Sequence, residues 1–196
     1  AEGRGYDITF INHNIGHSHS SYLEHCRYRG VDGVIAACIK FDDPEVIELA
    51  YSNLPIVTVD HVFNNRAAVL SDNTDGIHKL VDQLAALGHE RIAYIHGENH
   101  SAVTQKRLVG LYRACGERGL RIPEELSIIG FDNQIPVCCS LKPPLASIEN
   151  PLVDIGRTAM AELLQRIDAK HRKLTLPPSV RLLSGTLIER GSLRSL

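Results

Sequence analysis

Hydrophobic positions recur every three or four residues between residues 77 and 87, which is the clearest pattern in the chain. The apolar residues there are Ile77, Leu80, Val81, Leu84 and Leu87. This spacing places them on one face of an amphipathic helix. Asn73 or Thr74 can cap the start of that helix, and Gly88 can end it.

Short apolar runs of strand length alternate with helical segments along the first half of the chain. The predicted strands cover residues 7–12, 31–39, 54–60, 67–71 and 91–97, and further helices are predicted over residues 20–30 and 43–53. Such alternation is typical of parallel βα units. The sequence therefore predicts an α/β fold with open, doubly wound parallel sheets, where ligands bind beyond the carboxyl ends of the strands.

The second half of the chain has a less regular pattern. We expect a helix over residues 104–120, a strand over 126–131 and closing strands within 176–192. A long helix is predicted after Asn150 and Pro151, because asparagine followed by proline suits a helix cap and first turn.

Composition limits the class of protein. The chain has 196 residues, 43% of them hydrophobic and 22% charged, and its formal net charge is -2. This fits a globular protein of one core or two small lobes, and gives no overall basic surface for nucleic acid. No apolar run approaches the ~20 residues of a membrane span, and residues 1–6 do not resemble a signal peptide. We therefore expect a soluble, cytoplasmic protein with no membrane partner.

The cysteine content points to reduced thiols. The five cysteines are Cys26, Cys38, Cys115, Cys138 and Cys139, an odd number with no C-x-x-C pair. Most are expected to be small core residues. A reactive thiol at the adjacent Cys138 and Cys139 is an open alternative.

Motifs that hold phosphates or activate a serine are absent. There is no G-x-G-x-x-G after a strand, no G-x-x-x-x-G-K-[ST] and no G-x-S-x-G. No cofactor is therefore expected. A group of histidines, His13, His17, His19 and His25, leaves open a metal-dependent hydrolase or transferase. We favour a solvated loop without a bound metal.

Polar residues at predicted strand ends are the best candidates for ligand contacts. Asp60 and Asp132 each end a strand, and Arg107 lies in the first turns of a helix. An arginine flanked by aspartates suits a ligand with several hydroxyl groups or a planar polar ring. The alternatives are that Asp60 only ends its strand, Arg107 forms a surface ion pair, and Asp132 with Asn133 forms a turn.

Seven segments occur in an order that resembles a known family. They are RGVDGVI, LPIVTVD, LSDNTDGIHKLVDQLAALGHERIAYIHG, KRLVGLYRA, RIPEELSIIGFDN, PPLASIENPLVDIGRTAMAELL and GTLIERGS. Together they resemble the effector-binding region of the LacI/GalR family of bacterial transcription repressors. The resemblance implies a two-lobed fold like that of periplasmic sugar-binding proteins, with a small-molecule effector in the cleft between the lobes. It also implies a homodimer, and operator DNA bound by an N-terminal helix-turn-helix that this chain does not contain.

The resemblance implies specific ligand contacts and no catalytic residues. Arg107 matches the family's arginine before L-x-G, Asp132 its aspartate after the G-[FY] strand, and Asp60 the end of its P-[IV]-V strand. Asn150 and Leu152 match positions before and within the long late helix, although Asn150 also suits a helix cap. We therefore expect a sensor of a sugar or nucleoside and not an enzyme. A periplasmic solute receptor of the same fold is the alternative.

The resemblance also predicts how the chain divides. The N-terminal lobe would comprise residues 1–97 and 151–176, and the C-terminal lobe residues 98–150 and 177–196. The second lobe is expected to be incomplete, because the family has further βα units between KRLVGLYRA and RIPEELSIIGFDN. About 50 residues would be missing near residues 114–121, at roughly 30 residues per βαβ unit.

Overall fold

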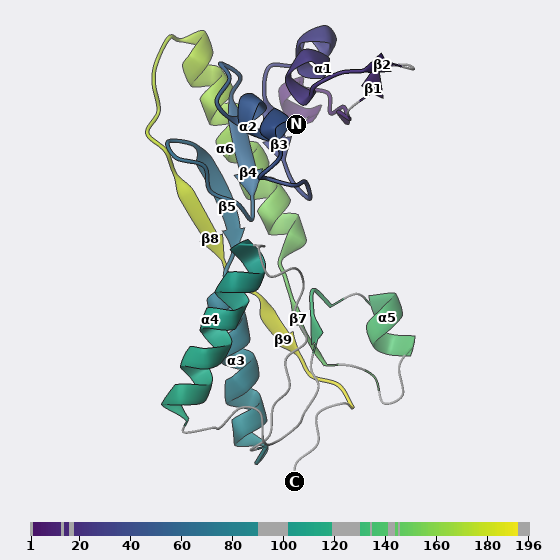
Figure 1. The fold of residues 1–196 in the computed structure, drawn as a ribbon, viewed down its shortest axis with the longest axis vertical. Coiled ribbons are helices and arrows are strands. Elements are labelled where there is room, and N and C mark those ends of the chain that lie inside the picture. Colours follow the sequence, from purple (N-terminus) through teal and green to yellow (C-terminus); the bar gives the residue numbers. More distant parts are fainter. Residues whose placement is uncertain are drawn as a thin grey trace. The chain divides into compact units, whose positions relative to one another are not determined.

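A computed structural model describes residues 2–12, 14–15, 18–89, 102–118, 130–133, 135–140, 144 and 146–191. The chain divides into two compact units (Figure 1). Unit 1 comprises Ala1–Leu70 and Val153–Arg181, and unit 2 comprises Ser71–Leu152 and Leu182–Leu196. The backbone therefore passes between the units three times.

These units differ from the lobes expected from the sequence. Residues up to 97 were expected in the first lobe, but Ser71–Leu152 belongs to unit 2. The reason is that α3 (Asn73–Ala86) packs closely against α4 (Ala102–Glu117). The apolar face of α3 is thus covered within unit 2 and is not part of the unit 1 core.

Unit 1 is built on a four-stranded sheet with the order β3-β4-β5-β8. Its elements are η1 (Glu2–Arg4), β1 (Asn14–Ile15), β2 (Ser18–His19), α1 (Tyr22–Arg29), β3 (Val34–Ala36), α2 (Pro44–Ala50), β4 (Ile56–Val59), β5 (Ala67–Ser71), α6 (Leu152–His171) and β8 (Val180–Leu183), of which β5, α6 and β8 extend past its boundary. Strands β3, β4 and β5 are parallel, as expected of βα units. Their register pairs Val34 with Ile56 and Val57 with Ala67.

The core of unit 1 lies where α1 and α2 meet the sheet. Leu23 and Cys26 of α1 pack with Val46 and Leu49 of α2 and with Ile56 of β4. Helix α6 packs on the chain just before β3. A Cβ atom at Gly33 would lie 2.8 Å from Leu163 Cδ1 of α6, so a larger residue there would require the Leu163 side chain to shift.

Unit 2 contains a three-stranded sheet and a pair of packed helices. Its elements are α3, α4, β6 (Gly130–Phe131), α5 (Ile135–Ser140), β7 (Ser147–Glu149) and β9 (Thr186–Ile188). The sheet order is β6-β7-β9, with β6 parallel and β9 antiparallel to β7. Four of the five residues predicted on the apolar face of α3 are buried: Ile77, Leu80, Val81 and Leu84 pack with Ile148 of β7, whereas Leu87 caps the helix and is half-buried.

Most predicted elements are present. The helices expected over 20–30, 43–53 and 73–88 are α1, α2 and α3, and Gly30 and Gly88 follow α1 and α3 with left-handed φ angles of 63° and 82°. The strand predicted over 31–39 is shorter, since β3 covers only Val34–Ala36. Helix α5 was not predicted, because its six residues show no helical period.

One strand prediction was wrong. Residues 7–12 form no strand, and the side chains of Ile8 and Phe10 are 65% and 94% exposed. An apolar run needs a neighbouring strand to form stable pairing, and none of the described residues provides one there. The strand predicted over 91–97 and most of the strand over 126–131 lie outside the described residues. No described helix is both long and apolar enough to span a membrane.

Candidate ligand-binding site in unit 2

Parallel pairing of β6 with β7 brings two predicted site residues together. The register aligns Gly130 with Ser147 and Phe131 with Ile148, so the residues that follow the strands reach the same edge of the sheet. Asp132 follows β6 directly, and Asn150 follows β7. The Asn150 side chain donates a hydrogen bond from Nδ2 to Asp132 Oδ1 over 2.7 Å.

Arg107 reaches the same carboxylate from helix α4. Its Nη2 donates to Asp132 Oδ1 over 3.3 Å, and its Nε donates to Asn73 Oδ1 over 2.7 Å. The guanidinium carbon lies 3.6 Å from the centroid of the Phe131 ring, within cation–π range. Arg107 is thus held by an amide, a carboxylate and an aromatic face at once. We call Asn73, Arg107, Phe131, Asp132 and Asn150 the Arg107 cluster.

Close packing of α3 and α4 sets the position of Arg107. A Cβ atom at Gly110 would lie 2.8 Å from Thr74 O, so glycine lets α4 approach the first turn of α3. Thr74 Oγ1 also donates to Lys106 O over 3.4 Å. Because Lys106 precedes Arg107, these contacts place the arginine beside Asn73.

Asn73 has a different role from the one predicted. The N-cap of α3 is Asp72, whose side chain accepts a hydrogen bond from the Asp75 N–H over 3.0 Å. Asn73 is instead the first helical residue and is buried. Its Nδ2 donates to Ser71 O over 3.2 Å, which turns its Oδ1 toward Arg107.

Asn133, which follows Asp132, makes a second set of polar contacts. The Asn133 N–H donates to Ser147 Oγ over 3.0 Å, and Asn133 Nδ2 donates to Glu149 Oε1 over 2.8 Å. Arg190 Nη2 donates to Asn133 Oδ1 over 2.6 Å. Asp132 and Asn133 both have positive φ angles, 74° and 39°, so the chain turns sharply at the end of β6. These bonds hold the turn and hence the Asp132 carboxylate.

The cluster offers both donors and acceptors to a ligand. Two of the five guanidinium N–H groups of Arg107 are used in the contacts above. Both hydrogen bonds that the described residues make to the Asp132 carboxylate fall on Oδ1, and the side chain is 45% exposed. A carboxylate accepts hydroxyl protons and an arginine donates to hydroxyl or ring oxygens, so the cluster suits a polyhydroxylated molecule.

The remaining predicted site residues, Leu152 and Asp60, make none of the contacts described above. Leu152 begins α6, and its side chain is 66% exposed. Asp60 belongs to unit 1, where it follows β4 with a left-handed φ of 60° and its N–H donates to Val69 O over 2.9 Å. Their contact with a ligand stays a prediction. For Asn150, the side-chain bond within the described residues goes to Asp132, and α6 begins two residues later.

Two members of the cluster were missed by sequence reasoning. Phe131 was assigned only to a strand, and Asn73 only to a helix cap. A signal existed for Asn73, because it lies just after the carboxyl end of β5, where ligands bind in such sheets. No pattern in the sequence identifies Phe131, since its stacking depends on the tertiary position of Arg107.

The histidines and cysteines give no metal or disulfide site within the described residues. His13 and His17 lie outside these residues. His19 Nε2 is 2.8 Å from Glu45 Oε1, and His25 Nδ1 is 2.8 Å from Asn12 O. Over the described part of the chain, no three His, Cys, Asp or Glu residues are grouped to hold a metal ion. Cys26 and Cys138 are buried, whereas Cys38 and Cys139 are exposed, and all four are free thiols. Burial raises the pKa of the Cys26 thiol, which lowers its reactivity.

Comparisons with known proteins match nearly the whole chain. A family model described as periplasmic binding proteins and sugar binding domain of LacI family matches residues 1–136. A second, described as periplasmic binding protein-like domain, matches residues 102–193.

Curated relatives are transcriptional repressors. The repressor CytR of Escherichia coli strain K12 is 41% identical over 88 residues, which are 45% of this chain and 24% of that protein. The repressor PurR of Glaesserella parasuis is 22% identical over 252 positions, covering 98% of this chain and 74% of that protein. This alignment is longer than the 196 residues of the chain, so PurR contains residues that this chain lacks. The chain matches about a quarter of the length of the first curated relatives.

A solved structure extends the similarity to the fold. The LacI family transcriptional regulator from Enterococcus faecium, solved with bound ribose, has a TM-score of 0.66 and 25% identity. The match covers 89% of this chain and 84% of that one. The α/β, periplasmic-binding-protein-like fold predicted from the sequence is therefore confirmed.

Proposed function

Because this chain belongs to the family of periplasmic binding proteins and LacI sugar-binding domains, we propose that it is the effector-sensing part of a transcriptional regulator. Its ligand is a small polyhydroxylated molecule, a sugar or a nucleoside. The ligand contacts the Arg107 cluster, and its binding changes the affinity of the full-length protein for operator DNA.

The observation that carries this proposal is the hydrogen-bonded group of Asn73, Arg107, Asp132 and Asn150 over the Phe131 ring. Its side chains hold one another through hydrogen bonds, so little side-chain entropy is lost on binding. Arg107 supplies fixed donors, and Asp132 supplies a partly exposed acceptor. This combination matches vicinal hydroxyl groups, which both donate and accept.

The related proteins favour regulation over solute uptake and over catalysis. The relatives are named as repressors, among them CytR, PurR and a ribose operon repressor. Solved neighbours that are named as regulators contain ribose or cellobiose. These names support a sensor whose ligand is bound without chemical change, rather than a periplasmic receptor or an enzyme.

The proposed mechanism is thermodynamic linkage. We infer that two copies act as a homodimer and that a helix-turn-helix segment of the full-length protein binds the operator. In this mechanism the protein has two conformations that differ in their affinity for DNA. A ligand that binds one of them more tightly shifts the population toward that conformation.

A ligand panel tests the sensing role. Thermal unfolding is followed with ribose, other pentoses and hexoses, cellobiose, nucleosides and free purines. A true effector at 100 times its dissociation constant adds ~2.7 kcal/mol of stability. The variant Arg107→Ala should lose this shift while retaining the native circular dichroism spectrum. A shift of the same size in the variant would remove Arg107 from the site.

A DNA-binding experiment separates regulator from receptor. The full-length protein is assayed by gel shift on the region upstream of its own gene, with and without the effector. A specific complex whose affinity depends on the effector supports the proposal. Ligand binding with no DNA affinity would support the receptor instead.

A further inference from the structure

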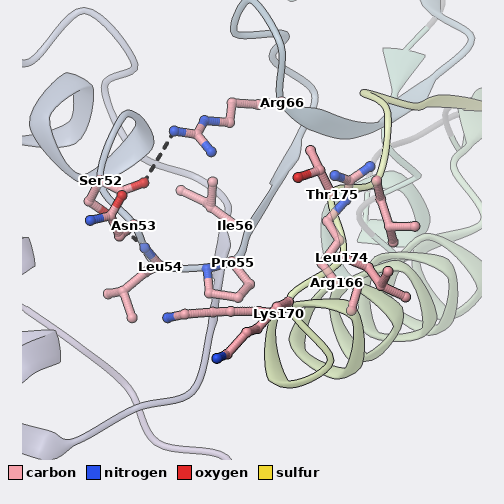
Figure 2. A pocket seen from close by; sticks show the side chains of 13 residues that line it. Ser52, Asn53, Leu54, Pro55, Ile56, Arg66, Arg166, Lys170, Leu174 and Thr175 are labelled. Carbon is pink, nitrogen blue, oxygen red and sulfur yellow. Dashed lines mark hydrogen bonds between the residues drawn. The ribbon is translucent and has the colours of Figure 1, made fainter.

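A cavity of about 430 Å³ opens in unit 1, and none of its lining residues belongs to the Arg107 cluster (Figure 2). Its walls are residues 52–56, which lead into β4, and the C-terminal end of α6 with the chain that follows it. In the view of Figure 2, Arg66 and Lys170 border the hollow from opposite sides. Its size falls in the range of about 300–1,000 Å³ that is usual for small-molecule sites.

The charged side chains that line this cavity are all positive. They are Arg66, Arg166, Lys170 and Lys173, and none of the described lining residues is acidic. Arg166 is compensated, because its Nη2 lies 2.8 Å from Glu162 Oε1 and both side chains are largely buried. Arg66, Lys170 and Lys173 form no ion pair with the residues that the structure describes. The lining therefore carries three uncompensated positive charges.

One buried N–H group of Arg66 has no hydrogen-bond acceptor among the described residues. Its Nη2 donates to Ser52 O over 3.2 Å, and its guanidinium carbon is 5.8 Å from the centroid of the Tyr51 ring. Its Nε is buried and has no hydrogen-bond acceptor among the described residues. A buried N–H without an acceptor is unfavourable, and an anionic oxygen that reached it would relieve this cost.

Part of the cavity lining is apolar. It includes Ile56 and Ala169, both buried, and the side chains of Leu54, Leu174 and Leu176. An apolar wall lowers the local dielectric constant and strengthens the attraction between the cations and an anion. It also provides a surface for the non-ionic part of a small ligand.

From these features we propose that unit 1 contains a second ligand site, which binds the phosphate group of a small phosphorylated metabolite between Arg66, Lys170 and Lys173. Arg66 donates a directed hydrogen bond, and the two lysines act as flexible point charges. The carbon skeleton of the metabolite contacts the apolar part of the lining. This site is independent of the effector site proposed in unit 2.

A structural role for the lysines is the main rival explanation. Lys170 lies in the last turn of α6, and Lys173 follows it with a left-handed φ of 56°, so both could simply offset the negative end of the helix dipole. That role predicts a loss of stability on substitution and no phosphate binding. It does not account for the buried Nε of Arg66.

Calorimetric titration tests the proposal on the whole chain with three probes: inorganic phosphate, ribose 5-phosphate and ribose. Ribose 5-phosphate is expected to bind in competition with inorganic phosphate, and its affinity should fall as sodium chloride is raised. The double variant Lys170→Gln/Lys173→Gln should weaken ribose 5-phosphate binding about tenfold or more. Arg172→Gln is the matched control, because Arg172 lies at the same helix end but pairs with Asp168 and does not line the cavity.

Each other result overturns the proposal. Undiminished binding in the double variant places the phosphate elsewhere, and equal binding of ribose and ribose 5-phosphate assigns both to a sugar site. Arg107→Ala separates the two sites, since it should leave phosphate competition unchanged. The same titration is made with a short DNA duplex. If the duplex binds strongly, the double variant loses this binding and ribose 5-phosphate does not bind, the cations would instead contact a nucleic-acid backbone.

Discussion

Arg107 Nε donates a hydrogen bond to Asn73 Oδ1 over 2.7 Å, which joins helix α4 to the first residue of α3. The bond fixes the plane of the guanidinium group, and the contact with Phe131 holds the guanidinium carbon 3.6 Å from the ring centroid. A free arginine has about 2 kcal/mol of rotamer entropy to lose on binding, and much of this loss has already occurred here. The hydrogen bond and the ring contact therefore hold the Arg107 guanidinium group in one orientation.

Replacing Arg107 by lysine tests that organisation. Lysine keeps the charge but cannot hydrogen-bond Asn73 and Asp132 with one planar group. We expect effector affinity to fall by about 10- to 100-fold, equivalent to ~1.5–3 kcal/mol for a charged hydrogen bond, with a native-like fold. Calorimetry with the effector from the ligand panel measures this loss.

The matched control for this variant is Arg113→Lys on the same helix. Arg113 is exposed, and its Nε pairs with Glu117 Oε1 over 2.9 Å, outside the Arg107 cluster. Effector affinity should be unchanged in Arg113→Lys. If Arg107→Lys binds as tightly as this control, the fixed fork of Arg107 is not required for recognition.

Asp132→Asn removes the charge of Asp132 and keeps the size and shape of its side chain. The carboxamide has nearly the same size, and Asp132 is 45% exposed, so the unfolding temperature should change little. Hydroxyl groups of the effector lose a charged acceptor, and affinity should fall about tenfold. Thermal unfolding and calorimetry on one preparation check both parts. A large loss of stability with unchanged affinity would give Asp132 a purely structural role.

The sequence predicts this fold well where local patterns decide it. The spacing of Ile77, Leu80, Val81 and Leu84 is sufficient to place α3, because one face of the helix is buried. The β-branched run before Asp60 likewise predicts β4. The strand predicted over residues 7–12 failed, because strand formation depends on a neighbour that no local pattern specifies.

The same limit applies to the site. Asp132, Arg107 and Asn150 were identified by strand ends and by resemblance, and the structure brings these three together. Phe131 was not identified, because the approach of Arg107 to its ring depends on α3–α4 packing at Gly110 and Thr74. Contacts between segments far apart in sequence are the part that sequence reasoning could not supply.

Gly110→Ala tests the packing that positions Arg107. The new methyl group would lie 2.8 Å from Thr74 O and 3.1 Å from Thr74 Cα, both backbone atoms. We expect a loss of about 1–3 kcal/mol in the free energy of unfolding, as for other overpacked sites. Chemical denaturation measures it, and effector affinity should fall as Arg107 shifts.

Gly156→Ala is the matched control on helix α6. No atom lies within 4 Å of a Cβ built at Gly156. Alanine should therefore stabilise the protein by about 0.5–1 kcal/mol through its higher helix propensity. Equal effects of the two substitutions would contradict the close approach of α4 to α3.

A histidine between α3 and α4 should make stability depend on pH. His78 Nε2 lies 2.7 Å from Glu117 Oε2, and Nδ1 lies 3.1 Å from Asp82 Oδ2. The hydrogen bond with Glu117 is the main cause that raises the pKa of His78 above its ordinary 6.5. A histidine whose pKa is higher in the folded state stabilises the fold fully at pH values below its unfolded-state pKa. This contribution is lost as pH rises through its folded-state pKa. Unfolding free energy should therefore decrease from near pH 6.5 upward.

His78→Gln should remove this decrease while leaving the dependence caused by other groups. Arg113 also contacts Glu117, and Arg118 contacts Asp82 over 2.6 Å, so both carboxylates remain paired in the variant. The hydrogen bond from His78 is the main cause that lowers the pKa of Glu117, so the contribution of Glu117 is lost only as pH falls through that lowered value. Denaturation curves at several pH values for both proteins make the comparison. Parallel pH profiles would exclude His78 as the source.

The left-handed backbone at Asp132 and Asn133 limits how the effector preference of this protein can be redesigned. Glycine, asparagine and aspartate are the residues that adopt such φ angles at low cost, whereas β-branched or bulky residues are strained there. A library randomised at position 132 and selected for stability should therefore return mostly glycine, aspartate and asparagine. Asn73 lies in a regular helix without this restriction, so new specificities are better sought at that position.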